Sequence, residues 1–568
     1  MHHPQPRRIV TEGIFVIQER VRENIYGVYR CFCSVLFVNI MASVKYTSTR
    51  GADRGTTFRD AVMRGLASDG GLLVPETIPQ IPTGALEKWK NMSFPELALN
   101  VMGCFVKGDE ISRDNLKKVI DASYLNGKWR DEEITPVREM KDGKYVLELF
   151  HGPTFAFKDV ALQFLGNLFE HILSERSGDE ARLTILGATS GDTGSSAIHG
   201  VRGKRGIECF IMFPHGAVSD VQRRQMTTVQ DKNIHCIAIK GTFDDAQSIV
   251  KSLNMDRAFK RKHRLGAVNS INWARILAQI VYYFYAYFRV MEKKRSPGKP
   301  GAKVSFSVPT GNFGDILAGY YAKRMGLPVD RFVVATNENN ILEIFFRTGK
   351  YHRQDSIKTN APSMDICVSS NFERFLYHMA GDDSKKTASL MQAFEKTSKM
   401  EVGGAFLKRC QDVMDASMVK ESDRFNTIER YFSSDGYILD PHSSIGVSAI
   451  SKMNFKSPIV CLACAHWAKF PDAIRTALDN LPERKVKKAM DTPDILKRLF
   501  SRSERKSVME NNSASIKDFI DSRMDASGSS NADDEGVYYP PSESRHILGT
   551  IAFLAAAAHF LSSRFFQN

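Results

Sequence analysis

Cysteine is scarce in this sequence, and its pattern does not indicate a disulfide-bonded protein. The 568 residues contain nine cysteines, an odd number, scattered along the chain. This usage indicates reduced thiols and a cytoplasmic or organellar location. A secretory signal peptide is also lacking, which argues against a secreted signalling protein. The apolar run 31–40 is too short for a clear transmembrane span, and the acidic residues before it argue against a transit peptide.

Acidic residues are fewer than basic ones, with 64 Asp and Glu against 78 Lys and Arg and a formal net charge of +14. A positive excess of this size raises the question of nucleic-acid or membrane binding. The basic residues are dispersed and no nucleic-acid-binding motif accompanies them, so we expect no nucleic-acid partner. We expect part of the charge to attract a phosphorylated substrate instead.

Strand-like and helix-like patterns alternate through the middle of the chain. Strands are predicted at 183–186, 207–213, 233–239, 304–308 and 332–336, with helices between them at 194–202, 218–227, 244–259, 273–290 and 314–325. This alternation predicts an α/β fold with parallel sheets covered by helices on both faces. Ligands bind such sheets at the carboxyl ends of the strands.

One lysine follows a predicted strand in apolar surroundings. The strand pattern 145–150 stops at a Gly-Pro pair, and a helix pattern begins near Lys158 and continues to Ile172. Phe155 and Phe157 flank the lysine. A desolvated lysine has a lowered pKa and can act as a nucleophilic, Schiff-base-forming amine. The alternative is an exposed lysine in the first turn of a helix.

Two glycine-rich turns, at 190–194 and 310–314, each follow a predicted strand and precede a predicted helix. Neither matches the nucleotide P-loop or the dinucleotide Gly-x-Gly-x-x-Gly fingerprint, so both of those motifs are lacking. Such turns present backbone N–H groups at a helix N-terminus, where anions bind. A desolvated lysine with two anion-binding turns fits pyridoxal 5′-phosphate, which offers an aldehyde and a phosphate. We expect no metal ion.

Several motifs with these features resemble the threonine synthase family, in the long form found in fungi and many bacteria. They are Phe-His-Gly-Pro-Thr-Phe-Ala-Phe-Lys-Asp at 150–159, Ser-Gly-Asp-Thr-Gly-Ser at 190–195, Asn-Ser-Ile-Asn-Trp-Ala-Arg-Ile at 269–276 and Pro-Thr-Gly-Asn-Phe-Gly-Asp-Ile at 309–316. The resemblance covers about residues 41–480. It implies the tryptophan-synthase-beta-like fold type II with a small N-terminal domain, and pyridoxal 5′-phosphate as cofactor.

The resemblance also implies roles for individual residues. Lys158 would bind the cofactor covalently and then move protons on the substrate. The cofactor phosphate would lie against Gly311, Asn312, Phe313 and Gly314, with Asp315 also near the cofactor. The substrate carboxylate would bind the turn formed by Ser190, Gly191, Asp192, Thr193 and Gly194. The substrate phosphate would contact Ser270, Asn272 and Arg275.

Three positions need further interpretation. A carboxylate beside the substrate carboxylate would repel it, so we expect Asp192 to point away and to shape its turn. For Arg275, a substrate contact and a charge on the helix surface remain equal alternatives. The family usually has threonine at the position of Cys464, where its hydroxyl meets the cofactor ring nitrogen, and proline at the position of Trp467. We interpret Cys461 and Cys464 as packing or site-lining residues, with redox activity as the alternative.

The reaction implied by the resemblance converts O-phosphohomoserine and water to threonine and phosphate. The alternatives are a related phospho-lyase, which would release 2-ketobutyrate and phosphate, and a non-catalytic scaffold. The expected assembly is a monomer or homodimer.

The expected organisation has five parts. Residues 1–40 form an atypical extension, with translation expected to begin at Met41. The N-terminal domain covers 41–125, and the catalytic region covers 126–480 with a helical insertion near 381–430. A charged tail follows at 481–545, with disorder expected after about Arg523. The apolar segment 546–568 is either a tail anchor, which would make a membrane a partner, or an unrelated or packed end.

Overall fold

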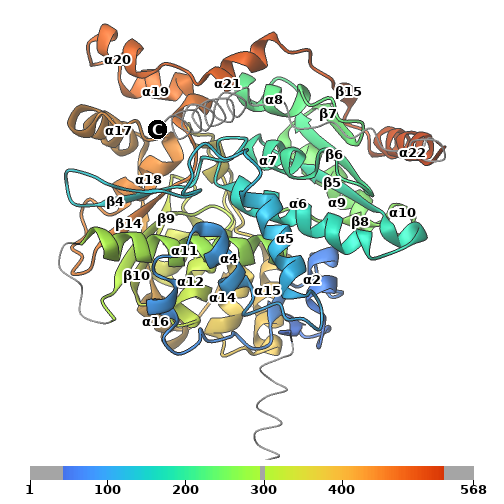
Figure 1. Ribbon diagram of the computed structural model, residues 1–568, viewed down its shortest axis with the longest axis horizontal. Coiled ribbons are helices and arrows are strands. Elements are labelled where there is room, and N and C mark those ends of the chain that lie inside the picture. Colours follow the sequence, from blue (N-terminus) through green and yellow to red (C-terminus); the bar gives the residue numbers. More distant parts are fainter. Residues whose placement is uncertain (1–42, 295–300, 530–568) are drawn as a thin grey trace, which may run out of the picture. The chain divides into compact units, whose positions relative to one another are not determined.

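The computed structural model describes residues 43–294 and 301–529 (Figure 1). The chain divides into two compact units, residues 1–513 and 514–568, and most of the described part of the second is the helix α22 (Ser513–Ser529). That helix continues past Arg523, where the sequence predicts that order ends. The expectations for residues 1–40 and for the apolar segment 546–568 lie outside the described residues.

The first unit contains a six-stranded sheet in the order β13-β10-β9-β14-β4-β3. Its strands are β3 (Val137–Glu139), β4 (Tyr145–Glu148), β9 (Val304–Pro309), β10 (Val329–Thr336), β13 (Met414–Met418) and β14 (Ile459–Ala463). All neighbours pair in parallel except β3, which is antiparallel to β4. The predicted parallel arrangement is confirmed for this sheet.

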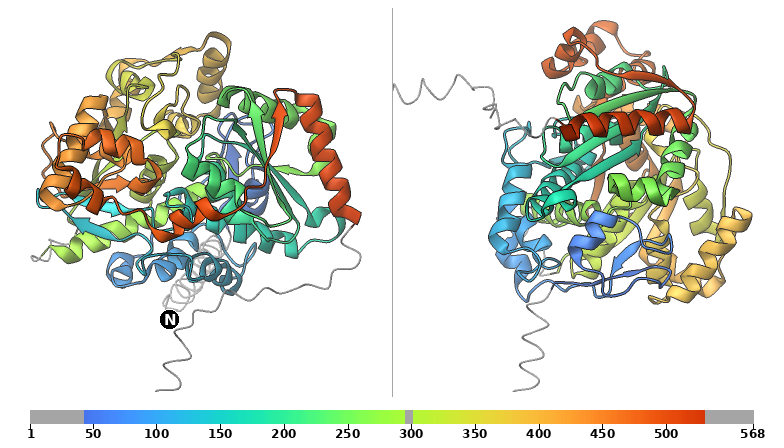
Figure 2. Two further views of the ribbon diagram at one scale, coloured as in Figure 1. Left: turned by 90° about the horizontal axis from the view of Figure 1, so that it is seen from above. Right: turned by 90° about the vertical axis from the view of Figure 1, so that its right-hand side faces the viewer.

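A second sheet has five strands, all parallel, in the order β15-β7-β6-β5-β8. The strands are β5 (Leu183–Ala188), β6 (Ile207–Pro214), β7 (Ile234–Lys240), β8 (Leu265–Gly266) and β15 (Ser507–Glu510). Figure 2 shows β15, in red, beside the green strands to which it adds an edge.

The inner strands β4, β9 and β14 of the six-stranded sheet are buried on both faces, as strands covered by helices should be. Successive side chains of β14 alternate between two hydrophobic clusters: Val460 and Leu462 pack with α11 (Trp273–Lys293) and α12 (Gly314–Arg324). Cys461 and its alternate neighbours pack with α17 (Glu421–Asp435), α18 (Pro441–Ala449) and α19 (Pro471–Ala477). The prediction of helices on both faces is confirmed here.

The helices between β4 and β8 follow the predicted pattern closely, apart from the short helix η1. They are α6 (Lys158–Ser174), η1 (Gly178–Ala181), α7 (Asp192–Val201), α8 (Asp220–Thr227), α9 (Phe243–Met255) and α10 (Arg257–His263). One difference is that the helix expected over 244–259 is two helices. The side chain of Asp256 accepts from the N–H groups of Ala258 and Phe259, and so caps the second helix instead of continuing the first.

The N-terminal segment contributes a short antiparallel pair and four helices. These are β1 (Tyr46–Ser48), β2 (Leu73–Pro75), α2 (Phe58–Arg64), α3 (Ala85–Trp89), α4 (Phe94–Met102) and α5 (Arg113–Tyr124). Their buried side chains belong to the same hydrophobic cluster as α6 and α11. This segment therefore shares its core with the catalytic region.

The region near 381–430 differs from the all-helical insertion that its charged sequence predicts. It contains α15 (Ser384–Thr397), α16 (Gly404–Val413) and two strands, β12 (Lys399–Glu401) and β13. Strand β12 pairs with β11 (Lys350–His352), and β13 is an edge strand of the large sheet. Helices α13 (Ile341–Thr348), η2 (Pro362–Met364) and α14 (Phe372–Met379) precede this region. The prediction failed because a short edge strand with polar residues lacks a clear apolar alternation.

Residues 483–510, expected in a charged tail, form ordered elements: α20 (Glu483–Ala489), α21 (Asp494–Lys497), η4 (Arg498–Ser501) and β15. Leu496 and Leu499 are buried against Phe155, Val221 and Ala468. Among the described residues, no helix combines the length and the apolar character needed to cross a membrane.

Candidate active site

The residues singled out in the sequence come together where strands of both sheets end. Lys158 is the first residue of α6, and Asp192 is the first residue of α7, shortly after β5. Gly314 begins α12 after β9, and Cys464 directly follows β14. Parallel strands place such residues at one edge of a sheet, and here two sheets contribute to one cluster.

Lys158 is buried, with 10% of its side-chain surface exposed. Its Nζ lies 4.6 Å from the centre of the Phe157 ring. Burial lowers the pKa of Lys158 below the usual lysine value; the charge of Asp192 opposes this shift, and the charge of Lys469 adds to it. The alternative of an exposed first-turn lysine is wrong.

Asp192 faces Lys158 and does not point away as the sequence interpretation had it. Its Oδ2 lies 3.5 Å from Nζ of Lys158, and its Oδ1 lies 2.6 Å from Nζ of Lys469. Gln222 donates from Nε2 to Oδ1 at 2.8 Å. Burial alone would raise the pKa of Asp192, but the two ammonium groups hold it well below the usual aspartate range. Asp192 is therefore ionised and paired.

Lys469 is the residue of this cluster that sequence reasoning missed. It ends the short helix η3 (Trp467–Lys469), and 0% of its surface is exposed. Besides its contact with Asp192, Nζ donates to the backbone oxygen of Thr154 at 2.9 Å. The available signal was a lysine between Ala468 and Phe470, a few residues after the buried strand β14.

The turn at 190–194 is held together by Thr189. Its Oγ1 accepts from the N–H groups of Gly191 and Gly194, each at 2.9 Å. Gly191 has φ 142°, and a Cβ there would lie 2.4 Å from the Gln222 side chain, so the position requires glycine. These two N–H groups are engaged within the turn, which leaves the half-buried Ser190 and Thr193 as its more accessible polar residues.

The turn at 311–314 leads directly into α12. Phe313 adopts a left-handed conformation with φ 62°, which turns the chain into the helix. A Cβ on Gly311 would lie 3.0 Å from the backbone oxygen of Ser363. The backbone oxygen of Asn312 accepts from the backbone and the side chain of Asn371 at 3.0 and 3.1 Å. The first N–H groups of α12 have no partner within the helix and suit a phosphate.

Asp315 lies in the first turn of α12 with one satisfied and one unsatisfied oxygen. Tyr282 and Tyr283 donate to Oδ1 at 2.6 and 2.8 Å. Oδ2 is buried and has no hydrogen-bond partner among the described residues. Burial raises the pKa of Asp315 to about 6, although the tyrosine hydroxyls lower it in part. Two aromatic residues of α11 therefore hold this carboxyl group.

Three residues of the segment 269–276 are predicted to contact the substrate phosphate. Their environments in the structure differ. Ser270 hydrogen-bonds the hydroxyl of Ser370 at 3.0 Å. Asn272 caps α11 through Oδ1, and its Nδ2 donates to the backbone oxygens of Val62 and Ala267, so its side chain is engaged in structure. The predicted substrate contact of Asn272 therefore has little geometric support.

Arg275 is 3% exposed, and the alternative of a charge on the helix surface is wrong. Its Nη1 donates to the backbone oxygen of Val268 at 3.1 Å, whereas its buried Nε has no hydrogen-bond partner in the part of the chain that the structure describes. Burial lowers the pKa of Arg275 to about 10, so the guanidinium remains charged at neutral pH. A buried cation with an unused donor suits an anionic ligand.

Cys464 is buried beside the loop that leads to Lys158, where its backbone oxygen accepts from the N–H of Phe157 at 2.7 Å. Burial raises the pKa of the Cys464 thiol well above its usual value and that of Cys461 to about 12. Neither thiol forms a thiolate at neutral pH, which supports packing or site lining over redox activity.

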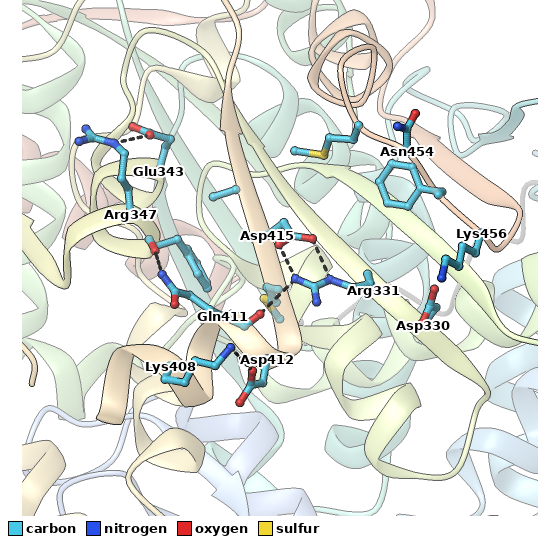
Figure 3. Close-up of a pocket in the computed structure, with 15 residues that line it drawn as sticks. Asp330, Arg331, Glu343, Arg347, Lys408, Gln411, Asp412, Asp415, Asn454 and Lys456 are labelled. Carbon is cyan, nitrogen blue, oxygen red and sulfur yellow. Dashed lines mark hydrogen bonds and ion pairs between the residues drawn. The ribbon is translucent and has the colours of Figure 1, made fainter. Parts of the chain in front are cut away.

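A surface cavity of about 850 Å³ lies away from these residues, along the edge strand β13. Figure 3 shows its charged walls, where Arg331 contacts Asp415 and Arg347 contacts Glu343. None of the residues predicted for the site lines this cavity. In the part of the chain that the structure describes, no cluster of three or more His, Cys, Asp or Glu side chains could hold a metal ion.

The sequence and the fold were compared with those of known proteins. Family models match the threonine synthase N terminus at residues 45–124, the pyridoxal-phosphate dependent enzymes at 132–465 and the threonine synthase C-terminal region at 443–520. The last match extends the resemblance beyond residue 480, where the sequence analysis ended it.

A threonine synthase from Schizosaccharomyces pombe is 47% identical over 470 residues, which cover 77% of this chain and 90% of that protein. The crystal structure of threonine synthase from yeast matches with a TM-score of 0.79 and 41% identity, covering 85% of this chain and 99% of its own. The structure of pyridoxal-phosphate-bound threonine synthase from Brucella melitensis matches over the same shares with a TM-score of 0.78 and 41% identity. The chain therefore belongs to the threonine synthase family of pyridoxal-phosphate-dependent enzymes.

Proposed function

We propose that this protein converts O-phospho-L-homoserine and water to L-threonine and phosphate, the last step of threonine biosynthesis. The observation that carries the proposal is the buried amine of Lys158, placed between two glycine turns that end strands of different sheets. Membership of the family supports the reaction, and the arrangement of charges supports a substrate with more than one anionic group. Lys158, Lys469 and Arg275 are buried cations of one cluster, against the two carboxyl groups of Asp192 and Asp315.

The residues present fit pyridoxal 5′-phosphate. Lys158 would bind its aldehyde, the turn from Gly311 to Gly314 would hold its phosphate, and Asp315 and Cys464 would lie beside its ring. The Oδ2 of Asp315 offers a buried hydrogen-bond acceptor that no residue of the described ranges 43–294 and 301–529 uses. When bound, the cofactor supplies an electron sink for breaking bonds to Cα of an amino-acid substrate.

The chain's own residues bind and orient the substrate. Ser190 and Thr193, the accessible polar residues of the 190–194 turn, would hold its carboxylate at the start of α7. Arg275 and Ser270 would contact its phosphate, for which Arg275 has the unused buried donor. Lys158 Nζ would take the proton from Cα and return one later, work that suits an amine with a lowered pKa. The positive field around the departing phosphate lowers the barrier to its loss.

Lys158→Ala tests the reaction and the residue together. Wild type given O-phosphohomoserine should release threonine and phosphate, and should show the visible absorbance band of the lysine-bound cofactor. The variant should lack the band and lose activity by a factor on the order of 10³ or more. Lys204→Ala is a matched control, because Lys204 is also shielded and pairs with Glu170 at 2.9 Å but lies outside the site.

Two results would contradict the proposal. Phosphate with 2-ketobutyrate and no threonine would assign the protein to the phospho-lyase alternative. An unchanged cofactor band in Lys158→Ala would show that another residue binds the cofactor.

The proposed substrate is a small molecule. We further propose that the protein is a monomer or homodimer and that it is located in the cytoplasm. We also propose the division into an N-terminal domain at 41–125 and a catalytic region at 126–480. The two parts share one hydrophobic core, as described above.

A further inference from the structure

Two buried lysines share one buried carboxylate in this site. Nζ of Lys469 lies 2.6 Å from Oδ1 of Asp192, whereas Nζ of Lys158 lies 3.5 Å from Oδ2. The side chain of Asp192 is 4% exposed, so water screens neither contact effectively. Because the attraction weakens with distance, Lys469 is the stronger partner of Asp192, and Lys158 is the weaker one.

Lys469 and Asp192 each make a further hydrogen bond that holds their contact in place. Gln222 on α8 donates to the same Oδ1 that Lys469 contacts. Nζ of Lys469 also donates to the backbone oxygen of Thr154, in the loop before Lys158, and Gln225 donates to that oxygen at 3.0 Å. These contacts hold the pair in place and tie it to the loop that positions Lys158.

We propose that Lys469 is a positioning residue for Lys158: it binds Asp192 and keeps it from becoming the full counter-ion of Lys158, whose amine can then lose its proton. This inference rests on the proposed function, in which Lys158 binds the cofactor. It also explains how Asp192 can lie in the turn proposed to bind the substrate carboxylate, which a free carboxylate would repel. Paired with Lys469, Asp192 carries a neutralised charge and does not repel a substrate carboxylate bound beside it.

The charged and titratable groups that face Lys158 come from several elements. They are Asp192 on α7, Lys469 on η3, Cys464 after β14, Arg275 on α11 and Asp315 on α12. Burial lowers the pKa of Lys158 most; Asp192 raises it, and Lys469 and Arg275 lower it. Lys469 acts twice, directly as a nearby cation and indirectly by engaging Asp192. Its removal should therefore affect Lys158 more than removal of a more distant cation.

The test measures how fast Lys158 binds the cofactor at different pH values. The full chain, prepared without cofactor, is mixed with pyridoxal phosphate, the reaction is stopped with borohydride, and peptide masses give the extent of labelling at Lys158. In Lys469→Met the pH midpoint of the rate should rise by about one unit or more, which slows labelling about tenfold at a fixed pH below the midpoint. Lys469→Arg keeps the charge and should restore the wild-type midpoint.

A double variant separates this role from a purely structural one. Lys469→Met with Asp192→Asn leaves no carboxylate at position 192 without its lysine partner, so it should fold even where the single variant does not. The pH midpoint of labelling in this double variant should return to the wild-type value or fall below it. The reason is that Asp192, the counter-ion that favours the charged form of Lys158, has been replaced by a neutral residue. Lys204→Met, which removes a lysine paired to Glu170 elsewhere, should leave the midpoint unchanged.

An unchanged midpoint in folded Lys469→Met would overturn the inference, as would a double variant with a midpoint above that of wild type. Both results would leave cofactor binding at Lys158 intact, and hence the proposed function. Absence of labelling at Lys158 in wild type would instead overturn the proposed function, and this inference with it.

Discussion

Asp315 shows at the scale of one residue how burial and hydrogen bonding compete. Two tyrosine hydroxyls donate to one of its oxygens, which stabilises the carboxylate, yet burial has the larger effect and raises its pKa to about 6. The folded protein therefore holds this carboxyl group in its neutral form more readily than the unfolded chain, whose aspartates have a pKa near 3.9. The ionised form destabilises the protein when no ligand is bound.

Asp315→Asn should accordingly stabilise the cofactor-free protein above pH 6, by about 3 kcal/mol at most, because two pKa units correspond to that energy. The gain should shrink as the pH falls from about 6 and vanish below about 4, where the carboxyl group is neutral in both the folded and unfolded states. Urea unfolding of wild type and variant between pH 4 and 8 would measure the difference. A stability difference that does not change with pH would contradict the assigned pKa shift.

At the scale of elements, the segment from α21 to β15 connects the surface to the site. Leu496 and Leu499 pack on Phe155, three residues before Lys158. Glu504 contacts Arg223 and accepts from the hydroxyl of Thr227 at 2.7 Å, both on α8. The same helix carries Gln222, which orients Asp192. This segment therefore supports the site although it contributes no residue to it.

Glu504→Gln should destabilise the protein by about 1 to 2 kcal/mol at pH 7, since it removes charge-assisted hydrogen bonds to α8 at a mostly shielded position. Burial raises the pKa of Glu504, but Arg223 and Thr227 outweigh this and lower it to about 2. The carboxylate thus contributes stability above about pH 4.5 that is lost as the pH falls toward 2, and wild type and variant should converge there. Denaturant midpoints at several pH values would measure this, with the exposed Glu483→Gln as control; equal midpoints at pH 7 would contradict it.

At the scale of the whole molecule, the chain carries a formal net charge of +14 and a site proposed to take a phosphorylated substrate. Exposed charges act over about 10 Å at 0.1 M ionic strength, and salt screens them beyond that distance. The charges within the site are buried and are screened much less.

Raising the ionic strength from about 0.02 to 0.3 M should therefore lower kcat/KM for O-phosphohomoserine by a factor on the order of 2 to 10, while kcat changes little. Steady-state kinetics at constant pH would test this. The absorbance band of the bound cofactor serves as the control that the site stays loaded. A kcat/KM independent of salt would show that the net charge does not steer the substrate.

The sequence by itself determined the features that depend on neighbouring residues. Runs of apolar residues marked β5, β6 and β10, because a parallel strand buried on both faces is apolar along most of its length. The break before Lys158 and the glycine turns were visible because Pro and Gly restrict or release the backbone locally. These signals gave the α/β fold, and the motifs they contain gave the family.

Only the tertiary structure decided how distant residues pair. Asp192 could not be placed from its own turn, because its partner Lys469 follows a strand of the other sheet. Asn272 reads as a ligand residue in its motif, but it caps α11 and binds the backbone near α2. Strand β13 is recognisable only through its pairing with β10. The local sequence determines where the chain turns and which residues of a strand or helix are buried. The partner of a charged side chain depends instead on which elements the fold brings together.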